Sequence, residues 1–177
     1  MPDPHSTTTS RRLRRTALGG QLVAWGGLLL VVLFVGAALA WPEVRDPWLR
    51  QMGLELGGNA QLGALVAAIP AATFGYCLWQ AGRLFATLRG ADPFAPRAVA
   101  ALVGLGWGAF ATGIAATLAH TALAYLESLG SADGTRTLAI AFGSTELATL
   151  LVGILALAFA LVIAEARRLE DDARGIV

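Results

Sequence analysis

Hydrophobic residues run in four long stretches that are almost free of charge and are separated by short polar segments. These stretches cover residues 16–42, 56–82, 98–126 and 137–164. Each is longer than the roughly 20 residues that a helix needs to cross a hydrocarbon layer. Apolar residues are continuous in them, which favours helices over the alternating strands of a membrane barrel. The pattern predicts an all-α integral membrane protein with four antiparallel transmembrane helices in a bundle with short loops.

The same pattern divides the chain into three parts. We expect residues 1–15 to form a disordered basic tail, residues 16–166 to form the transmembrane domain and residues 167–177 to form a charged C-terminal tail. Within the domain, the expected spans are 17–41, 57–82, 98–126 and 138–164.

The end of the first apolar stretch resembles a signal-peptide cleavage site, because Ala38-Leu39-Ala40 precedes Trp41. A signal peptide, however, has an apolar region of only about 7–15 residues. The stretch in this chain is longer, so we expect it to be retained as a membrane helix.

Composition supports a membrane protein, since 56% of the residues are hydrophobic and 14% are charged, against about 25% charged in soluble domains. Cys77 is the single cysteine, and no nucleotide-binding or catalytic motif occurs. The net charge is +1, and no basic face exists outside the N-terminal run. We therefore expect a non-enzymatic chain with no cofactor, no metal and no direct nucleic-acid binding, whose surroundings are the lipid bilayer.

Arginine supplies all thirteen basic residues and is distributed unevenly. The N-terminal segment, the loop around residues 83–97 and the C-terminal segment contain ten of them, and the other two loops contain three. Cytoplasmic segments carry an excess of basic residues. We therefore expect both termini and the loop between the second and third spans to face the cytoplasm. Trp41, Trp48 and Tyr125 then lie at the outer interface, where aromatic side chains gather.

Two ionisable residues lie inside the predicted spans: His120 in the third and Glu146 in the fourth. Such groups are costly in a membrane and usually face protein or water, with a partner. At 1.5 Å per residue, His120 lies about 9 Å and Glu146 about 13 Å from the outer ends of their spans. Because neighbouring spans are antiparallel, we expect both side chains to face the bundle interior and to lie near each other.

Three interpretations of this pair remain open. The two residues form a protonatable pair that senses or moves protons, or a structural hydrogen bond between helices. Alternatively, His120 lies near the lipid headgroups and is exposed to water. A metal site is not expected, because it would need a third ligand at the same depth.

Small and polar residues also recur at helical spacing in the spans. Thr73, Tyr76 and Gln80 form a row that lies on the cytoplasmic side of Pro70. This row either lines a small water-filled cleft or makes ordinary hydrogen bonds between helices. Spacings of four residues allow helix backbones to approach closely. They occur at Gly104/Gly108, Ala109/Gly113 and Ala156/Ala160/Ala164.

The residues of the turn between the second and third spans are those expected to end one helix and begin the next. Gly90 is suited to end a helix in a left-handed cap, Pro93 prevents the helix from resuming, and Pro96 is suited to begin the next helix. Two interpretations stay open, a tight helix–helix connection and a docking surface for a cytoplasmic partner. The candidate docking residues are Arg89, Gly90, Asp92, Pro93 and Phe94.

The middle and the end of the chain together resemble a known family. The matching residues are Ile69, Pro70, the run 84–94, Pro96, Val99, Leu102, Gly106, Trp107 and the ending 170–177 with its acidic cluster and final valine. Over residues 61–177 the chain resembles the small bacterial membrane proteins of domain of unknown function 2975. It differs at Ala95, where serine is common, and at Ile176, where threonine often precedes the last valine.

This resemblance implies four spans, a central proline in the second span and a cytoplasmic turn after it. The family is similar to other small membrane proteins whose genes lie beside a short helix-turn-helix regulator, which implies such a regulator as a cytoplasmic partner. It implies no activity.

Together these observations predict a multi-pass protein of the bacterial cytoplasmic membrane. The leading hypothesis for its function is a non-enzymatic membrane regulatory or interaction protein. The alternative is a small proton-linked channel or transporter subunit that uses His120 and Glu146.

Overall fold

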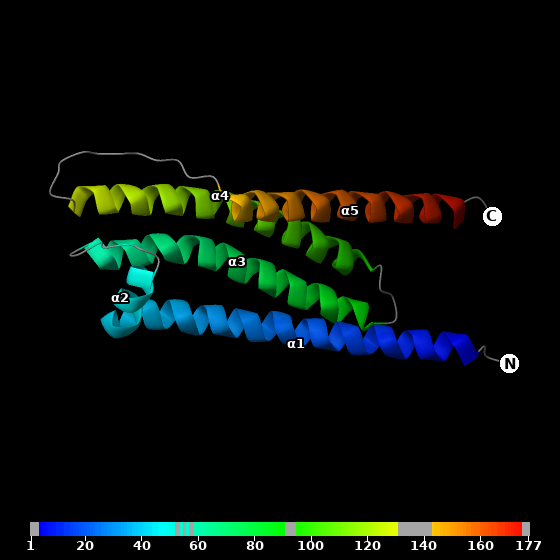
Figure 1. The fold of residues 1–177 in the computed structure, drawn as a ribbon. Coiled ribbons are helices and arrows are strands. Elements are labelled where there is room, and N and C mark those ends of the chain that lie inside the picture. Colours follow the sequence, from blue (N-terminus) through cyan, green and yellow to red (C-terminus); the bar gives the residue numbers. More distant parts are fainter. Residues whose placement is uncertain are drawn as a thin grey trace.

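The computed structural model describes residues 4–51, 54, 56, 59–90, 95–130 and 143–174. These residues form five helices and no strand. The helices are α1 (Pro4–Ala40), α2 (Pro42–Gln51), α3 (Ala60–Leu88), α4 (Pro96–Gly130) and α5 (Ser144–Arg174). All except α2 are long and apolar enough to cross a membrane, and they run antiparallel to their neighbours (Figure 1). The prediction of an all-α chain with four antiparallel spans is confirmed.

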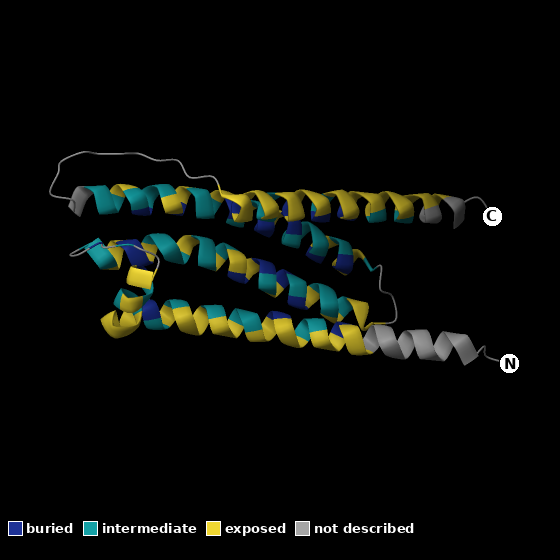
Figure 2. Cartoon of the chain, viewed as in Figure 1, coloured by how far each residue is buried: buried dark blue, intermediate teal, exposed yellow. Residues whose placement is uncertain are grey.

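The four long helices pack in chain order, with α1 on α3, α3 on α4 and α4 on α5 (Figure 1). Within the described residues, α1 and α5 lie on opposite sides of this arrangement and do not pack together. The bundle is therefore open. In the 18-residue apolar segment of each long helix, 39% of the residues are buried in α4, but only 11% are buried in α1 and in α5. Figure 2 shows the exposed residues concentrated on these two outer helices.

Glycines bring neighbouring helices close together. On α3, Gly82 lies under Trp25 of α1, since a Cβ at Gly82 would be 2.9 Å from the indole nitrogen. Gly104 and Gly108 of α4 face Gln80 and Cys77 of α3. The spacing of four residues at Gly104 and Gly108 therefore serves the contact between α3 and α4, as expected for small residues at helix interfaces.

The short helix α2 was not predicted from the hydropathy pattern, because its residues are mainly polar. Pro42 occupies its first position, Glu43 its first turn and Arg50 its last turn, an arrangement that suits the backbone and the dipole of a helix. Leu49 is buried with Leu56 and Leu123. The helix therefore closes the end of the bundle where α1 ends and α3 begins.

Several predicted boundaries need correction. The tail expected to be disordered is helical from Pro4 onward, so α1 includes residues 4–15. Proline suits the first helical turn, and extending a formed helix is easier than nucleating one. The charged C-terminal segment, for which no disorder was predicted, continues α5 as far as Arg174.

The last span begins at Ser144 and not at residue 138, and Gly143 lies outside the helix. Residues 138–142 lie outside the described part of the chain. The apolar side chains in this segment extend the hydropathy signal beyond the start of α5, which explains the wrong boundary.

Candidate functional site

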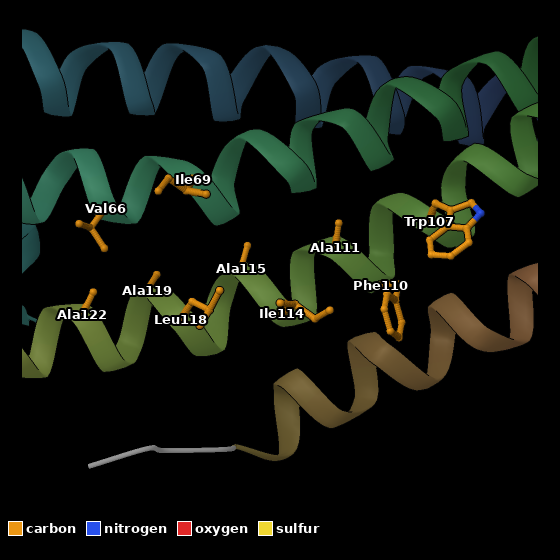
Figure 3. Close-up of a pocket in the computed structure, with 10 residues that line it drawn as sticks. All are labelled: Val66, Ile69, Trp107, Phe110, Ala111, Ile114, Ala115, Leu118, Ala119 and Ala122. Carbon is orange, nitrogen blue, oxygen red and sulfur yellow. The ribbon is translucent and has the colours of Figure 1, made fainter. Parts of the chain in front are cut away.

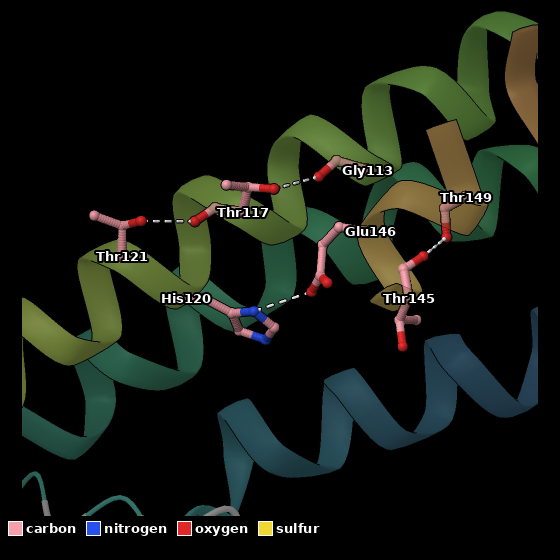
Figure 4. A network of polar contacts seen from close by, with 7 residues as sticks. All are labelled: Gly113, Thr117, His120, Thr121, Thr145, Glu146 and Thr149. Atoms are coloured by element: carbon pink, nitrogen blue, oxygen red, sulfur yellow. Dashed lines mark hydrogen bonds and ion pairs between the residues drawn. The ribbon is translucent and has the colours of Figure 1, made fainter. Parts of the chain in front are cut away.

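The structure brings His120 of α4 and Glu146 of α5 together. The distance from Nδ1 of His120 to Oε1 of Glu146 is 3.1 Å (Figure 4). The Glu146 side chain is 7% exposed, but that of His120 is 55% exposed. Only Glu146 therefore faces the helix interface. The expectation that His120 faces the bundle interior is wrong, because α5 begins two residues before Glu146 and covers α4 no further than this pair.

The late start of α5 also changes the depth assigned to Glu146. It is the third residue of α5 and lies in its first turn, about 3 Å along the axis from the first residue. The expected depth of about 13 Å from the outer end of the span is therefore wrong. A carboxylate in the first turn of a helix is stabilised by the positive end of the helix dipole.

Below this pair, α4 and α5 are in close backbone contact. A Cβ at Gly153 would lie 2.8 Å from the Phe110 nitrogen and 2.9 Å from the Gly106 oxygen. Another at Gly113 would meet Leu150 at 2.8 Å and the Glu146 carbonyl oxygen at 3.3 Å. Gly106, Gly113 and His120 recur every seven residues on α4, opposite Glu146 and Gly153, which are also seven residues apart on α5. The contact between His120 and Glu146 therefore lies at the end of a helix seam built from glycine.

Threonines near the pair are bonded within their own helices. The hydroxyl of Thr117 donates to the Gly113 oxygen at 3.0 Å, and that of Thr121 donates to the Thr117 oxygen at 2.9 Å. On α5, Thr149 donates in the same way to the Thr145 oxygen at 2.8 Å (Figure 4). Such bonds satisfy the hydroxyls locally. The hydroxyls of Thr117 and Thr121 are therefore bonded to the backbone of α4 and not to α5.

The chemistry available to the site is proton exchange within one histidine–carboxylate pair. Among the residues that the structure describes, no group of three His, Cys, Asp or Glu side chains could hold a metal ion. The pair gains charge-assisted hydrogen bonding when His120 is protonated and Glu146 is ionised.

A second polar cluster lies on α3, and the sequence indicated only part of it. Buried Gln80 donates through Nε2 to the Tyr76 hydroxyl at 2.7 Å, and Nη1 of Arg83 donates to its Oε1 at 3.4 Å. Thr73, expected in the same row, donates to the Pro70 oxygen at 2.9 Å. The row is therefore bonded within α3 itself. Arg83, which sequence analysis did not single out, was signalled only by its spacing of three residues from Gln80.

The candidate docking turn is partly described. The Gly90 N–H donates to the Thr87 oxygen at 2.9 Å, and Gly90 does not have a left-handed backbone. The predicted left-handed cap is therefore wrong, and α3 ends in a tighter turn of the 3₁₀ type. Pro96 begins α4 as predicted. Asp92, Pro93 and Phe94 lie outside the described residues.

Arg89 makes a contact that sequence analysis did not indicate. Its Nη1 donates to Oε1 of Gln21 on α1 at 2.6 Å. This bond ties the end of α3 to α1 beside the candidate docking turn.

Two apolar grooves run along the surface of the bundle. One, of about 510 Å³, is lined by Val66 and Ile69 of α3 and by the face of α4 from Trp107 to Ala122 (Figure 3). The other, of about 550 Å³, lies between α1 and α3.

The family described as protein of unknown function (DUF2975) matches residues 35–174. The chain belongs to the DUF2975 family. The match includes all of α2 to α5, and with them both His120 and Glu146, so the predicted resemblance is confirmed. No curated protein and no solved structure matches the chain. Membership of the DUF2975 family therefore covers the helices α2 to α5 but indicates no activity for the chain.

Proposed function

We propose that this DUF2975 chain is a non-enzymatic membrane protein that regulates other proteins by binding them. The open order of the helices carries the proposal. Helices α1 and α5 each pack on one long helix, and large apolar side chains such as Leu155 and Phe159 remain exposed on α5. Such faces are free to pack against helices of another membrane protein through van der Waals contacts.

The proposed location is the bacterial cytoplasmic membrane, with both termini inside. The ends of α1 and α5 that lead to the termini are at the same end of the bundle as the turn between α3 and α4 (Figure 1). These are the segments that contain ten of the thirteen arginines, and the positive-inside rule places them in the cytoplasm.

We expect a reporter fused after Val177 to read as cytoplasmic and one inserted in residues 131–134 to read as external. Paired alkaline phosphatase and fluorescent-protein fusions measure this orientation. The opposite labelling would contradict the orientation and would place His120 and Glu146 near the cytoplasmic surface.

The proposed cytoplasmic partner is a helix-turn-helix regulator, which the family resemblance implies. The turn that begins with Arg89 and Gly90 supports this choice, because Arg89 is exposed at the end of the bundle assigned to the cytoplasm.

Photo-cross-linking in native membranes tests the proposed function. A photoreactive residue at Phe159, which is 62% exposed, is expected to give a discrete cross-linked protein. The same residue at the adjacent Ala160, which is 1% exposed, is the matched control and should give none. Labelling of lipid alone from Phe159 and from further exposed positions on α1 and α5 would contradict the proposal.

The alternative, a proton-linked channel or transporter subunit, has one supporting observation. Glu146 is buried and lies 3.1 Å from the imidazole of His120. The two apolar grooves on the surface of the bundle do not provide a polar path for protons. We expect purified protein in liposomes to conduct no more protons than protein-free liposomes, as measured with an internal pH dye. A flux that is lost in Glu146→Gln would establish the alternative instead.

A further inference from the structure

The groove between α1 and α3 combines an apolar channel with a positive charge at one end. Its walls are Leu28 to Leu39 of α1 and Ala68 to Trp79 of α3. We propose that it binds one phospholipid with an anionic headgroup, whose acyl chain lies in the groove and whose phosphate lies at Arg83. This ligand site is separate from the protein-binding role proposed above.

The dimensions of the groove fit an acyl chain. From Ala68 to Trp79 it follows α3 for about 16 Å, close to the roughly 15 Å depth of one hydrocarbon leaflet. Along α1 it passes Gly36, where a Cβ would meet nothing within 4 Å. The floor between the two helices includes the buried Gly75.

The charged end of the groove is built from Trp79 and Arg83. The guanidinium carbon of Arg83 lies 5.0 Å from the centre of the Trp79 ring, and Trp79 itself lines the groove. Arg83 is exposed and lies about 6 Å beyond Trp79 along α3, toward the end where Arg89 lies. Cations at this level attract anionic lipid headgroups, and tryptophan prefers the interface.

The combination of groove and cation selects the occupant. A free phosphate would need Arg83 but not the apolar channel, and a helix of a second copy would need the channel but not the cation. No described residue that lines either groove is charged. The two grooves differ at their aromatic ends: the Arg83 guanidinium lies over Trp79 of the α1–α3 groove, and no such contact is found at Trp107 of the α3–α4 groove among the described residues. An anionic phospholipid is the ligand whose two parts match both parts of the α1–α3 site.

Native mass spectrometry of the full chain in nonionic detergent tests this site. Phosphatidylglycerol and phosphatidylcholine with the same acyl chains are added in equal amounts. We expect phosphatidylglycerol to be retained preferentially, and Arg83→Ala to reduce its binding by about fivefold, the effect of one headgroup contact. Arg97→Ala removes an exposed arginine outside the groove and should leave binding unchanged.

Gly36→Leu adds a side chain to the wall of the groove, at a position where a Cβ meets no protein atom within 4 Å, and should reduce the binding of both lipids. Circular dichroism and thermal unfolding check that each variant is folded. Equal losses in Arg83→Ala and Arg97→Ala, or no loss in Arg83→Ala, would overturn the proposal. Displacement of the lipid by inorganic phosphate alone would also overturn it. A dimer that forms without lipid and that Gly36→Leu dissociates would overturn it as well.

Discussion

Replacement of Gly153 by leucine is expected to separate α5 from α4 and to give the largest loss of stability in the chain. A Cβ at this position lies 2.8 Å from the Phe110 nitrogen and 2.9 Å from the Gly106 oxygen. Both atoms belong to a helix backbone and cannot turn away as a side chain can. Overpacking of this kind costs about 1–3 kcal/mol, and contact with rigid backbone favours the upper end.

Thermal unfolding in detergent micelles measures this loss. Gly26→Leu on α1 is the matched control, because a Cβ at Gly26 meets nothing within 4 Å. Leucine also has a higher helix propensity than glycine, by roughly 0.5–1 kcal/mol, so the control should be neutral or stabilised. Equal midpoints for the two variants would show that α4 and α5 do not meet at Gly153.

Glu146→Leu is expected to give the second largest effect. The variant removes the carboxylate that contacts Nδ1 of His120 and leaves that nitrogen facing a leucine. The expected loss is about 1–2 kcal/mol, near the upper range for polar contacts between membrane helices. Glu146→Gln keeps an acceptor in the same place and should be tolerated.

A double-mutant cycle with His120→Leu separates this contact from other effects of the substitutions. If the pair interacts, the loss in the double variant is smaller than the sum of the losses in the two single variants. Additive losses would mean that the two side chains contribute to stability independently.

The sequence predicted the spans well because hydropathy records which segments must avoid water. It did not predict α2, because most residues of this helix are polar or charged and Leu49 is its buried residue. It also placed the start of α5 too early, because residues 137–142 are mostly apolar although the helix begins at Ser144. Gly143 followed by Ser144 is the local signal that could have corrected this boundary.

The partners of each helix could not be predicted from hydropathy, because the spans are apolar on all sides. Only close contacts reveal them, such as Gly153 against the backbone of α4. The proximity of His120 and Glu146 followed from the cost of isolated polar groups in a membrane. The exposure of His120 did not, because it depends on how far α5 extends along α4.

The order of the helices is the central claim, because the exposed faces of α1 and α5 depend on it. Cysteine cross-linking in native membranes, in a Cys77→Ala background, tests it. Two pairs report the expected contacts. They are Gly27→Cys with Leu78→Cys between α1 and α3, and Gly113→Cys with Leu150→Cys between α4 and α5, at sites where each glycine faces the named leucine.

A third pair, Leu30→Cys with Leu155→Cys, tests whether the outer helices meet. The contacts through α3 and α4 place Gly27 of α1 and Leu157 of α5 at similar depth, and the exposed Leu30 and Leu155 both lie slightly toward the same end of the bundle from them. The open bundle predicts disulfides within one chain for the first two pairs and none within one chain for the third. An efficient intrachain disulfide in the Leu30→Cys, Leu155→Cys double variant, seen as a shifted monomer band, would show a closed bundle and contradict the account.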